Sequence, residues 1–203
     1  MVIDFDTAAL GVMRMAHHAG LRDWVPATSG NFSVRMDNLH CAVTATGGDK
    51  GQVTMEGIIL APIDGPAPER QSAEAELHYV LYRLDASIGA VAHVHAMPAV
   101  LASLTAQGKD HVRLEGLELL KAFAGLKTHE TALDVPVFEN DQDMIRLGRI
   151  AKERLAGIRP CWGFLIAGHG LYAWGPDVTT ALRHLDAFDY LFRLTLKLKG
   201  VPV

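Results

Sequence analysis

The chain has 203 residues, of which 49% are hydrophobic and 21% are charged, a composition that excludes a disordered or fibrous protein. Its 19 basic and 23 acidic residues give a formal charge of −4, and no run of Lys or Arg offers the basic stripe that nucleic acid requires. No apolar run reaches the roughly 18 residues of a membrane-spanning helix. We therefore expect one domain over residues 1–203 that binds neither nucleic acid nor a membrane.

The chain start and the cysteine content indicate the compartment. Asp4 and Asp6 lie near the N-terminus, which lacks the basic and then apolar pattern of a secretory signal. The two cysteines, Cys41 and Cys161, are too few for a disulfide framework. Both observations favour the cytoplasm.

The first half of the chain alternates between helical and strand patterns. Apolar residues from Leu10 to His17 lie at helical spacing, and three consecutive aliphatic residues from Ile58 indicate a buried strand. A second apolar stripe begins at Leu77 with the spacing of an amphipathic helix, for which Ser72 is the expected N-cap. In chain order we predict a helix over residues 6–23, strands over 32–35, 40–44 and 57–63, a helix from residue 72 onward, and a strand over 88–95.

The second half continues this alternation. Pro98 suits the first turn of a helix, and Lys197 and Lys199 suit the negative end of a final helix. Further elements are predicted as a helix over residues 117–124, a strand over 132–138, a helix over 142–156, a strand pair around 168–170 and a helix over 177–199. Such mixing of helices and strands indicates an α/β or α+β layered domain.

The His93-Val94-His95 motif is the strongest chemical signal in the sequence. Because residues i and i+2 of a strand face the same side, about 6.6 Å apart, two imidazoles can converge on one metal ion. The pair alone is equally compatible with metal-free strand histidines. His169, however, lies between two glycines, where the backbone can approach a site closely. Three histidines with an open fourth position are typical of catalytic zinc, so we predict one zinc ion on His93, His95 and His169, projecting from neighbouring strands.

Glutamates are the candidates for proton transfer. Glu74 lies four residues before His78, in a predicted first helical turn where negative charge suits the helix dipole. Glu115 and Glu118 lie three residues apart and could equally form a solvated face. Spacing alone does not choose among them. The remaining histidines are interpreted as structural or solvent-facing, namely His17, His18, His40, His78, His111, His129 and His184.

Short motifs resemble the class II aldolase/adducin family in order and approximate spacing. They are Thr28-Ser29-Gly30-Asn31, Thr46-Gly47, Ser72-Ala73-Glu74, His93-Val94-His95 and His169. The resemblance covers nearly the whole chain. It implies a three-layer α/β/α domain with a central, largely antiparallel sheet, one zinc ion per subunit, and a cyclic homotetramer with active sites between subunits.

The same resemblance implies a small-molecule sugar phosphate as substrate. Turns and helix N-termini offer unpaired N–H groups to anions, in agreement with this expectation. Related aldolases have two serines before the glutamate, whereas Ala73 stands at the second position here, so one hydroxyl contact is in question. The residues expected at the phosphate are Ser29, Gly30, Asn31, Thr46, Gly47 and Ser72.

Longer segments resemble the dehydratases of this family and imply a hydro-lyase of methionine salvage that removes water from a methylthio-substituted ketose phosphate. Resemblance to the dehydratases favours Glu118 as the acid/base, whereas resemblance to the aldolases favours Glu74; we place Glu118 first. The alternatives are a sugar-phosphate aldolase or epimerase and a metal-free interaction module like the adducin head. Retention of all three histidines speaks against the last. The segments are 24–33, 113–116, 118–121, 135–140 and 168–175.

Overall fold

A mixed β-sheet forms the centre of the computed structural model, which describes residues 2–106, 108–158 and 160–203. Within these residues the sheet has eight strands in the order β3-β2-β1-β4-β8-β7-β6-β5. Strands β6 and β7 are parallel, and the other neighbouring pairs are antiparallel. The strands are β1 (Asn31–Arg35), β2 (His40–Thr44), β3 (Ile58–Pro62), β4 (Ala90–Val94), β5 (His111–Glu115), β6 (Ala132–Phe138), β7 (Gly163–Ile166) and β8 (Gly170–Gly175).

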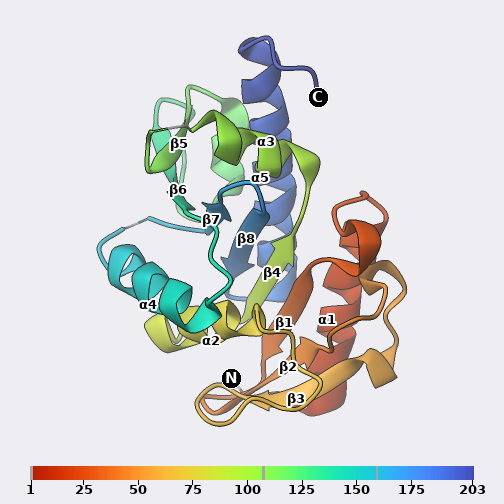
Figure 1. Cartoon of the computed structure of the whole chain (residues 1–203). Helices are drawn as coiled ribbons and strands as arrows, with labels where there is room; N and C mark the ends of the chain where they lie inside the picture. Colours follow the sequence, from red (N-terminus) through yellow and green to blue (C-terminus); the bar gives the residue numbers. More distant parts are fainter. Residues whose placement is uncertain (1, 107, 159) are drawn as a thin grey trace.

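Helices cover both faces of the sheet, as Figure 1 shows. They are α1 (Phe5–Gly20), α2 (Ala75–Leu84), α3 (Met97–Thr105), α4 (Met144–Leu155) and α5 (Val178–Leu198), with short 3-10 helices η1 (Pro26–Thr28), η2 (Lys50–Gln52), η3 (Met55–Gly57) and η4 (Glu118–Ala122). Asp4, Asp143 and Asp177 cap α1, α4 and α5 through their side chains. The expected three-layer α/β/α architecture with a largely antiparallel sheet is confirmed.

Alternate residues of β4 pack against the helices on opposite faces of the sheet. Ala90, Ala92 and Val94 belong to the core cluster beneath α1, α3 and α5, whereas Val91 belongs to the cluster beneath α2 and α4. Successive strand residues point to opposite faces. His93 therefore points to the same side as Val91, toward α2.

Several boundaries differ from the sequence-based predictions for identifiable reasons. The predicted helix over 117–124 is only the 3-10 helix η4, which lies between Gly116 and Gly125, both with positive φ. The strand predicted as buried is β3, an edge strand that pairs with β2 and leaves Leu60 51% exposed. Helix α2 begins at Ala75, and the Ser72 hydroxyl accepts the N–H of Glu74 at 3.3 Å just outside the helix.

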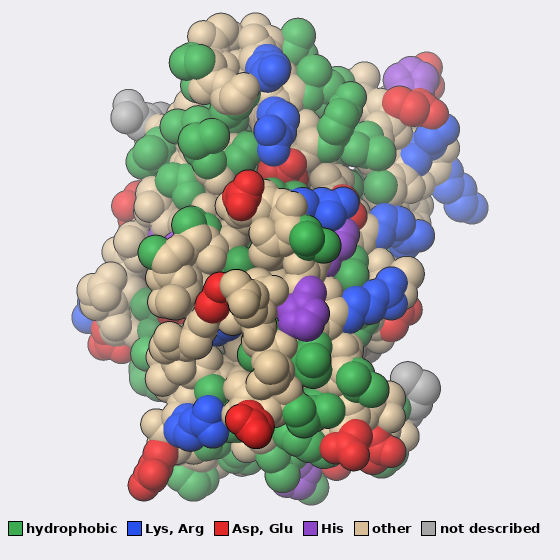
Figure 2. All heavy atoms as spheres, turned by 90° about the vertical axis from the view of Figure 1, so that its right-hand side faces the viewer, with side chains coloured by type: hydrophobic (Ala, Val, Ile, Leu, Met, Phe, Trp, Pro, Cys, Tyr) green, Lys and Arg blue, Asp and Glu red, His purple; other side chains and the backbone are tan. Residues whose placement is uncertain are grey.

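The outer surface adds two observations. On the face shown in Figure 2, basic, acidic and apolar side chains are interspersed rather than gathered into a field of one sign. Among the helices of the described residues, none combines the length and apolar character required to cross a membrane.

Candidate active site

The three predicted histidine ligands meet where strand β4 ends and strand β8 begins. His93 is fully buried near the end of β4, and His95 follows that strand, with its N–H donating to the Trp24 carbonyl at 2.8 Å. Because β4 and β8 are antiparallel, the end of β4 meets the start of β8. His169 lies there in the turn between β7 and β8, not on a strand as predicted. That turn is closed by the His169 N–H bonding the Ile166 carbonyl at 3.1 Å.

Four donor side chains converge at this point. Nε2 of His95 lies 3.0 Å from Nε2 of His93 and 3.1 Å from Nε2 of His169. The carboxylate of Glu74 lies 3.0 Å from Nε2 of His169 and 3.5 Å from Nε2 of His93. All four donor atoms fall within 4.8 Å of one another. Ligands of a tetrahedral zinc ion at 2.0–2.1 Å lie about 3.3 Å apart, so the observed separations match such a centre.

The hydrogen bonds behind the cluster fix which nitrogens face inward. Nδ1 of His93 donates to the Leu171 carbonyl at 3.1 Å, and Nδ1 of His169 donates to Oδ1 of Asn140 at 3.3 Å. A neutral imidazole that donates from Nδ1 presents a lone pair at Nε2. Lone pairs and a carboxylate directed at one point repel each other without a cation. The donor set therefore fits a bound metal ion.

The electrostatics of the cluster give the protonation states that a metal requires. Burial lowers the pKa of His93 well below its ordinary value, and burial followed by the neighbouring His169 lowers the pKa of His95. Burial opposes ionisation of Glu74, but its 3.0 Å contact with His169 and the nearby imidazoles lower the pKa of this carboxyl to about 2. At neutral pH the site thus offers neutral imidazoles at His93 and His95 and an ionised carboxylate at Glu74.

Glu74 is oriented by neighbours from other elements. Nδ2 of Asn31 donates to its carboxylate at 2.8 Å, and the Tyr172 hydroxyl donates to its backbone carbonyl at 3.2 Å. The Tyr172 ring also stacks on His93, with ring centroids 4.1 Å apart. Glu74 occupies the N-cap position of α2 without capping it through its side chain, because that side chain turns toward the histidines.

The predicted phosphate turn lies beside the histidines. Gly30 has a φ of 78°, and a Cβ there would lie 2.8 Å from the His93 carbonyl, so only glycine fits. Ala27 and Thr28 also have positive φ, a strained conformation for a β-branched residue such as Thr28. Within the described residues, the buried Ser29 Oγ and Asn31 Oδ1 have no hydrogen-bond partner. Strain and unpartnered polar atoms at one turn are typical of a ligand site.

The remaining predicted phosphate residues are brought to the same region. An isolated bridge joins Ala45 to Gln71, and the N–H of Thr46 donates to the Arg70 carbonyl at 2.8 Å. The loop that carries Thr46 and Gly47 is thereby held beside the segment that leads to Ser72. The structure thus assembles the predicted phosphate segments around Glu74.

Glu118 lies elsewhere in the chain. At the start of η4 its side chain is 68% exposed, and it pairs with Lys121 and with His129. Glu115 pairs with Arg113 at 2.7 Å. Within the described residues of one chain, neither glutamate belongs to the cluster formed by Glu74 and the histidines.

Some neighbours of the site were not singled out from the sequence. Tyr172 and Asn140 lie within the segments 168–175 and 135–140, so the resemblance of those segments was the available signal. Lys50 is a third such residue, and the signal was its position in the glycine-rich run 46–51.

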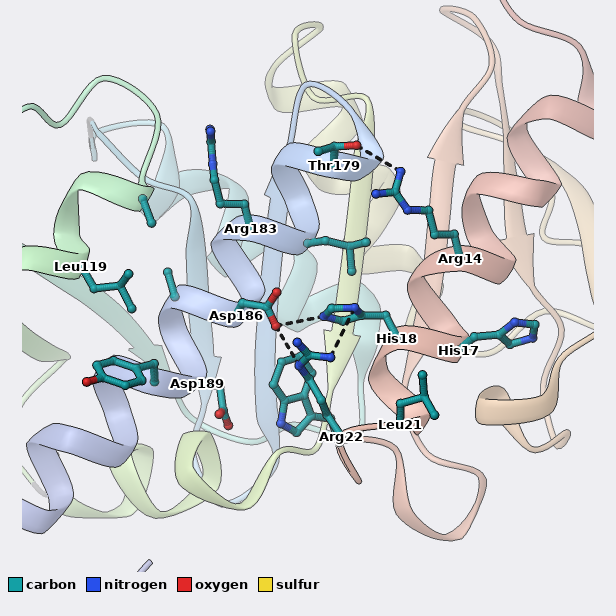
Figure 3. Close-up of a pocket in the computed structure, with 15 residues that line it drawn as sticks. Arg14, His17, His18, Leu21, Arg22, Leu119, Thr179, Arg183, Asp186 and Asp189 are labelled. Carbon is teal, nitrogen blue, oxygen red and sulfur yellow. Dashed lines mark hydrogen bonds and ion pairs between the residues drawn. The ribbon is translucent and has the colours of Figure 1, made fainter.

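A surface pocket of about 920 Å³ lies away from the donor cluster, between α1, α5 and η4. In Figure 3, His18 and Arg22 converge on Asp186, while Arg14 donates to Thr179. None of the four clustered donor residues lines this cavity. The candidate active site is therefore identified by its converging ligands and not by cavity size.

The fold and the donor cluster together define a domain of the class II aldolase type with a candidate metal centre. A model of the class II aldolase and adducin N-terminal domain matches residues 11–196, and the chain belongs to this family. A relative from Parvibaculum lavamentivorans, named methylthioribulose-1-phosphate dehydratase, is 50% identical over 96% of this chain and 95% of its own length. A relative of the same name from Stenotrophomonas maltophilia is 47% identical over the same shares of the two chains.

Solved structures share the architecture. L-fuculose-1-phosphate aldolase from Thermus thermophilus superposes with a TM-score of 0.75 at 25% identity, over 94% of this chain and 93% of that one. The YgbL protein of Klebsiella pneumoniae gives a TM-score of 0.82 at 16% identity, over 99% and 94% of the two chains. The second likeness concerns the fold alone.

Proposed function

We propose that this chain is a zinc-dependent methylthioribulose-1-phosphate dehydratase of methionine salvage. The observation that carries the proposal is the convergence of three Nε2 atoms and the Glu74 carboxylate in a chain with relatives of that name over nearly its whole length. Residues 1–203 act as one domain in this proposal, and the reaction takes place in the cytoplasm.

Zinc is held by His93, His95 and His169 in this proposal. Neutral imidazoles suit zinc, and three protein ligands with an open position are typical of catalytic sites. When bound there, zinc supplies Lewis-acid polarisation of the C2 carbonyl and the neighbouring hydroxyl oxygen of the substrate. The Glu74 carboxylate lies within the same donor cluster, beside the open position.

Glu118 transfers the proton in the proposed reaction. The resemblance to the dehydratases favours Glu118 over Glu74 in this role, and Glu74 is already engaged in the donor cluster. Removal of the C3 proton and loss of the C4 hydroxyl as water leave an enol, which tautomerises to 2,3-diketo-5-methylthiopentyl 1-phosphate. Because the Glu118 side chain is exposed on its own chain, it would act across a subunit boundary.

A homotetramer with active sites between subunits is therefore part of the proposal. Light scattering coupled to size-exclusion chromatography measures the assembly directly, with four chains as the expected result. A monomer that retains full activity would remove the basis for assigning Glu118 to a neighbouring subunit.

The phosphate end of the substrate binds the turn and loop segments beside Glu74. Support comes from the unpartnered, buried Ser29 hydroxyl and the strained backbone that precedes it. Open N–H groups of turns suit an anion. The proposed phosphate residues are Ser29, Gly30, Asn31, Thr46, Gly47 and Ser72.

The decisive experiment incubates the zinc-loaded protein with methylthioribulose 1-phosphate and follows the product by mass spectrometry. The expected result is loss of one water, abolished by a chelator and restored by added zinc. A substrate that remains intact in the presence of bound zinc would contradict the proposal.

A sugar-phosphate aldolase is the second candidate, favoured by the structural likeness to L-fuculose-1-phosphate aldolase. It would use the same donor cluster but cleave a carbon–carbon bond. Incubation with fuculose 1-phosphate and assay for the two aldehyde or ketone fragments tests this candidate in the same preparation.

A further inference from the structure

Lys50 is a buried cation next to the candidate active site. Lys50 is 3% exposed, and its Nζ donates to the carbonyls of Gly48 at 2.7 Å and of Thr28 at 3.3 Å. Within the described residues it forms no salt bridge with a carboxylate. A buried ammonium is costly unless an anion accompanies it.

The backbone around Lys50 is held by rigid contacts. Helix η2 packs against the end of α1, where a Cβ on Gly20 would lie 2.4 Å from the Cα of Gly51. Nε2 of His17 also donates to the Val53 carbonyl at 2.8 Å. These contacts fix the start of the lysine side chain, so its ammonium is not a mobile surface charge.

Both carbonyl partners of Lys50 belong to segments of the proposed phosphate site. Thr28 directly precedes Ser29, and Gly48 directly follows Gly47. The ammonium therefore lies at the junction between the turn and the loop. Thr28 lies there with a φ of 67°.

The proposed phosphate residues are all uncharged, although a phosphate monoester carries close to two negative charges at neutral pH. Arg70, in the adjoining segment, donates from its guanidinium to the Glu56 carbonyl and is exposed. Asp49 and Glu74 act electrostatically on Lys50, and burial lowers the pKa of Lys50 while these two carboxylates raise it. Lys50 is thus the buried positive charge at this junction, and its third N–H can serve a ligand.

We propose that Lys50 supplies the positive charge that binds the substrate phosphate between residues 28–31 and residues 46–51, and so makes the site specific for phosphorylated substrates. This inference rests on the proposed function, in which the substrate is a phosphate ester. Lysine binds phosphate as a point charge in this way at other sites.

The test compares Lys50→Met and Lys50→Arg with Lys152→Met, a matched loss of one charge on the exposed face of α4. Inorganic phosphate is the probe, titrated calorimetrically into zinc-loaded protein. Lys50→Met is expected to weaken phosphate binding roughly 10- to 100-fold, as loss of a charge-assisted contact implies. Lys50→Arg recovers most of that loss, and Lys152→Met leaves phosphate affinity unchanged. Zinc content and thermal unfolding verify each fold, with Lys50→Gln as a second neutral variant.

Kinetic measurements distinguish a contribution from the charge of Lys50 from a purely structural role in holding the turn and the loop together. With methylthioribulose 1-phosphate, Lys50→Met should raise KM and change kcat little, because the phosphate takes no part in the proton transfer. With unphosphorylated methylthioribulose, kcat/KM should stay the same. Equal losses with both substrates, or phosphate affinity unchanged in the neutral variants, would overturn the inference. If wild type fails to dehydrate the substrate yet binds phosphate through Lys50, only the proposed reaction fails.

Discussion

Oε1 of Glu74 lies 3.0 Å from Nε2 of His169, although 95 positions separate the two residues in the sequence. Replacing Glu74 by Gln removes the negative charge from the donor cluster and keeps the shape of the side chain. We expect zinc affinity to fall about 10- to 100-fold, because the lost negative charge lies next to the Nε2 atoms of His169 and His93 and attracts the cation. Competition with a fluorescent chelator measures this affinity, and unaltered binding would contradict a supporting role for Glu74.

Glu118→Gln is expected to retain its zinc and to lose activity. Because Glu118 lies outside the donor cluster, its zinc content should equal that of wild type. Loss of a general acid/base should lower kcat by about 10²- to 10⁴-fold. Full activity of this variant would contradict the assignment of Glu118 as the acid/base. A large loss of kcat in both Glu118→Gln and Glu74→Gln would show that the two carboxylates share the proton transfer.

Gly170 tests the close packing beneath the histidines. A Cβ at this position would lie 2.2 Å from the Val94 carbonyl oxygen and 3.2 Å from Cε1 of His93. We expect Gly170→Ala to cost about 1–3 kcal/mol of unfolding free energy through overpacking, together with weaker zinc binding. Urea unfolding and zinc titration measure the two effects. Gly157→Ala is the control, because a Cβ there meets only the Arg154 carbonyl at 3.8 Å; equal stability of the two variants would contradict the packing argument.

His184 predicts an acid-sensitive stability. Its Nδ1 donates to the Trp174 carbonyl at 2.7 Å, and its Nε2 accepts the N–H of Ala124 at 3.2 Å, so both nitrogens are used in the neutral form. Burial lowers the pKa of His184 to about 4, below the value of about 6.5 in an unfolded chain. Between these values the unfolded state binds the proton and the native state does not. Stability should therefore decrease as pH falls from 6.5 to 4, by up to about 1.4 kcal/mol per pH unit.

Urea unfolding of wild type and His184→Gln at several pH values in this window isolates the contribution of His184. The variant should be less stable at pH 7 but should lose less stability on acidification. Parallel pH profiles for the two proteins would show that another group is responsible.

Metal removal should destabilise the protein, because the inward-facing lone pairs then repel one another. A ligand that binds only the native state contributes about 4 kcal/mol at a free concentration 1,000 times its Kd. We expect a clear rise in Tm when zinc is added to chelator-treated protein, and little rise in His95→Asn. Calorimetry at fixed pH provides the measurement. The same Tm with and without bound zinc would argue against a centre formed by these residues.

Sequence patterns predicted the three histidines that converge because two of them follow from strand alternation and the third from its glycine neighbours. The approach of Glu74 to these histidines depends on how α2 docks against the end of β4, which no local spacing reveals. Lys50 was missed for a related reason, since only the contact of η2 with α1 shows that it is buried. Local patterns were also insufficient for β3, where Leu60 is exposed because pairing at an edge is a property of the whole sheet.

Asn31, His93 and Tyr172 lie in one row across neighbouring strands. Adjacent strands are about 4.8 Å apart, so the backbone holds the proposed phosphate turn and the candidate metal ligands at a fixed separation. In the proposed reaction, hydrogen-bonded strands then set the distance from the phosphate to the C2 carbonyl, whereas proton transfer depends on Glu118 in the separate short helix η4. Replacing that glutamate would change the proton transfer without altering the distance between the proposed phosphate turn and the histidines.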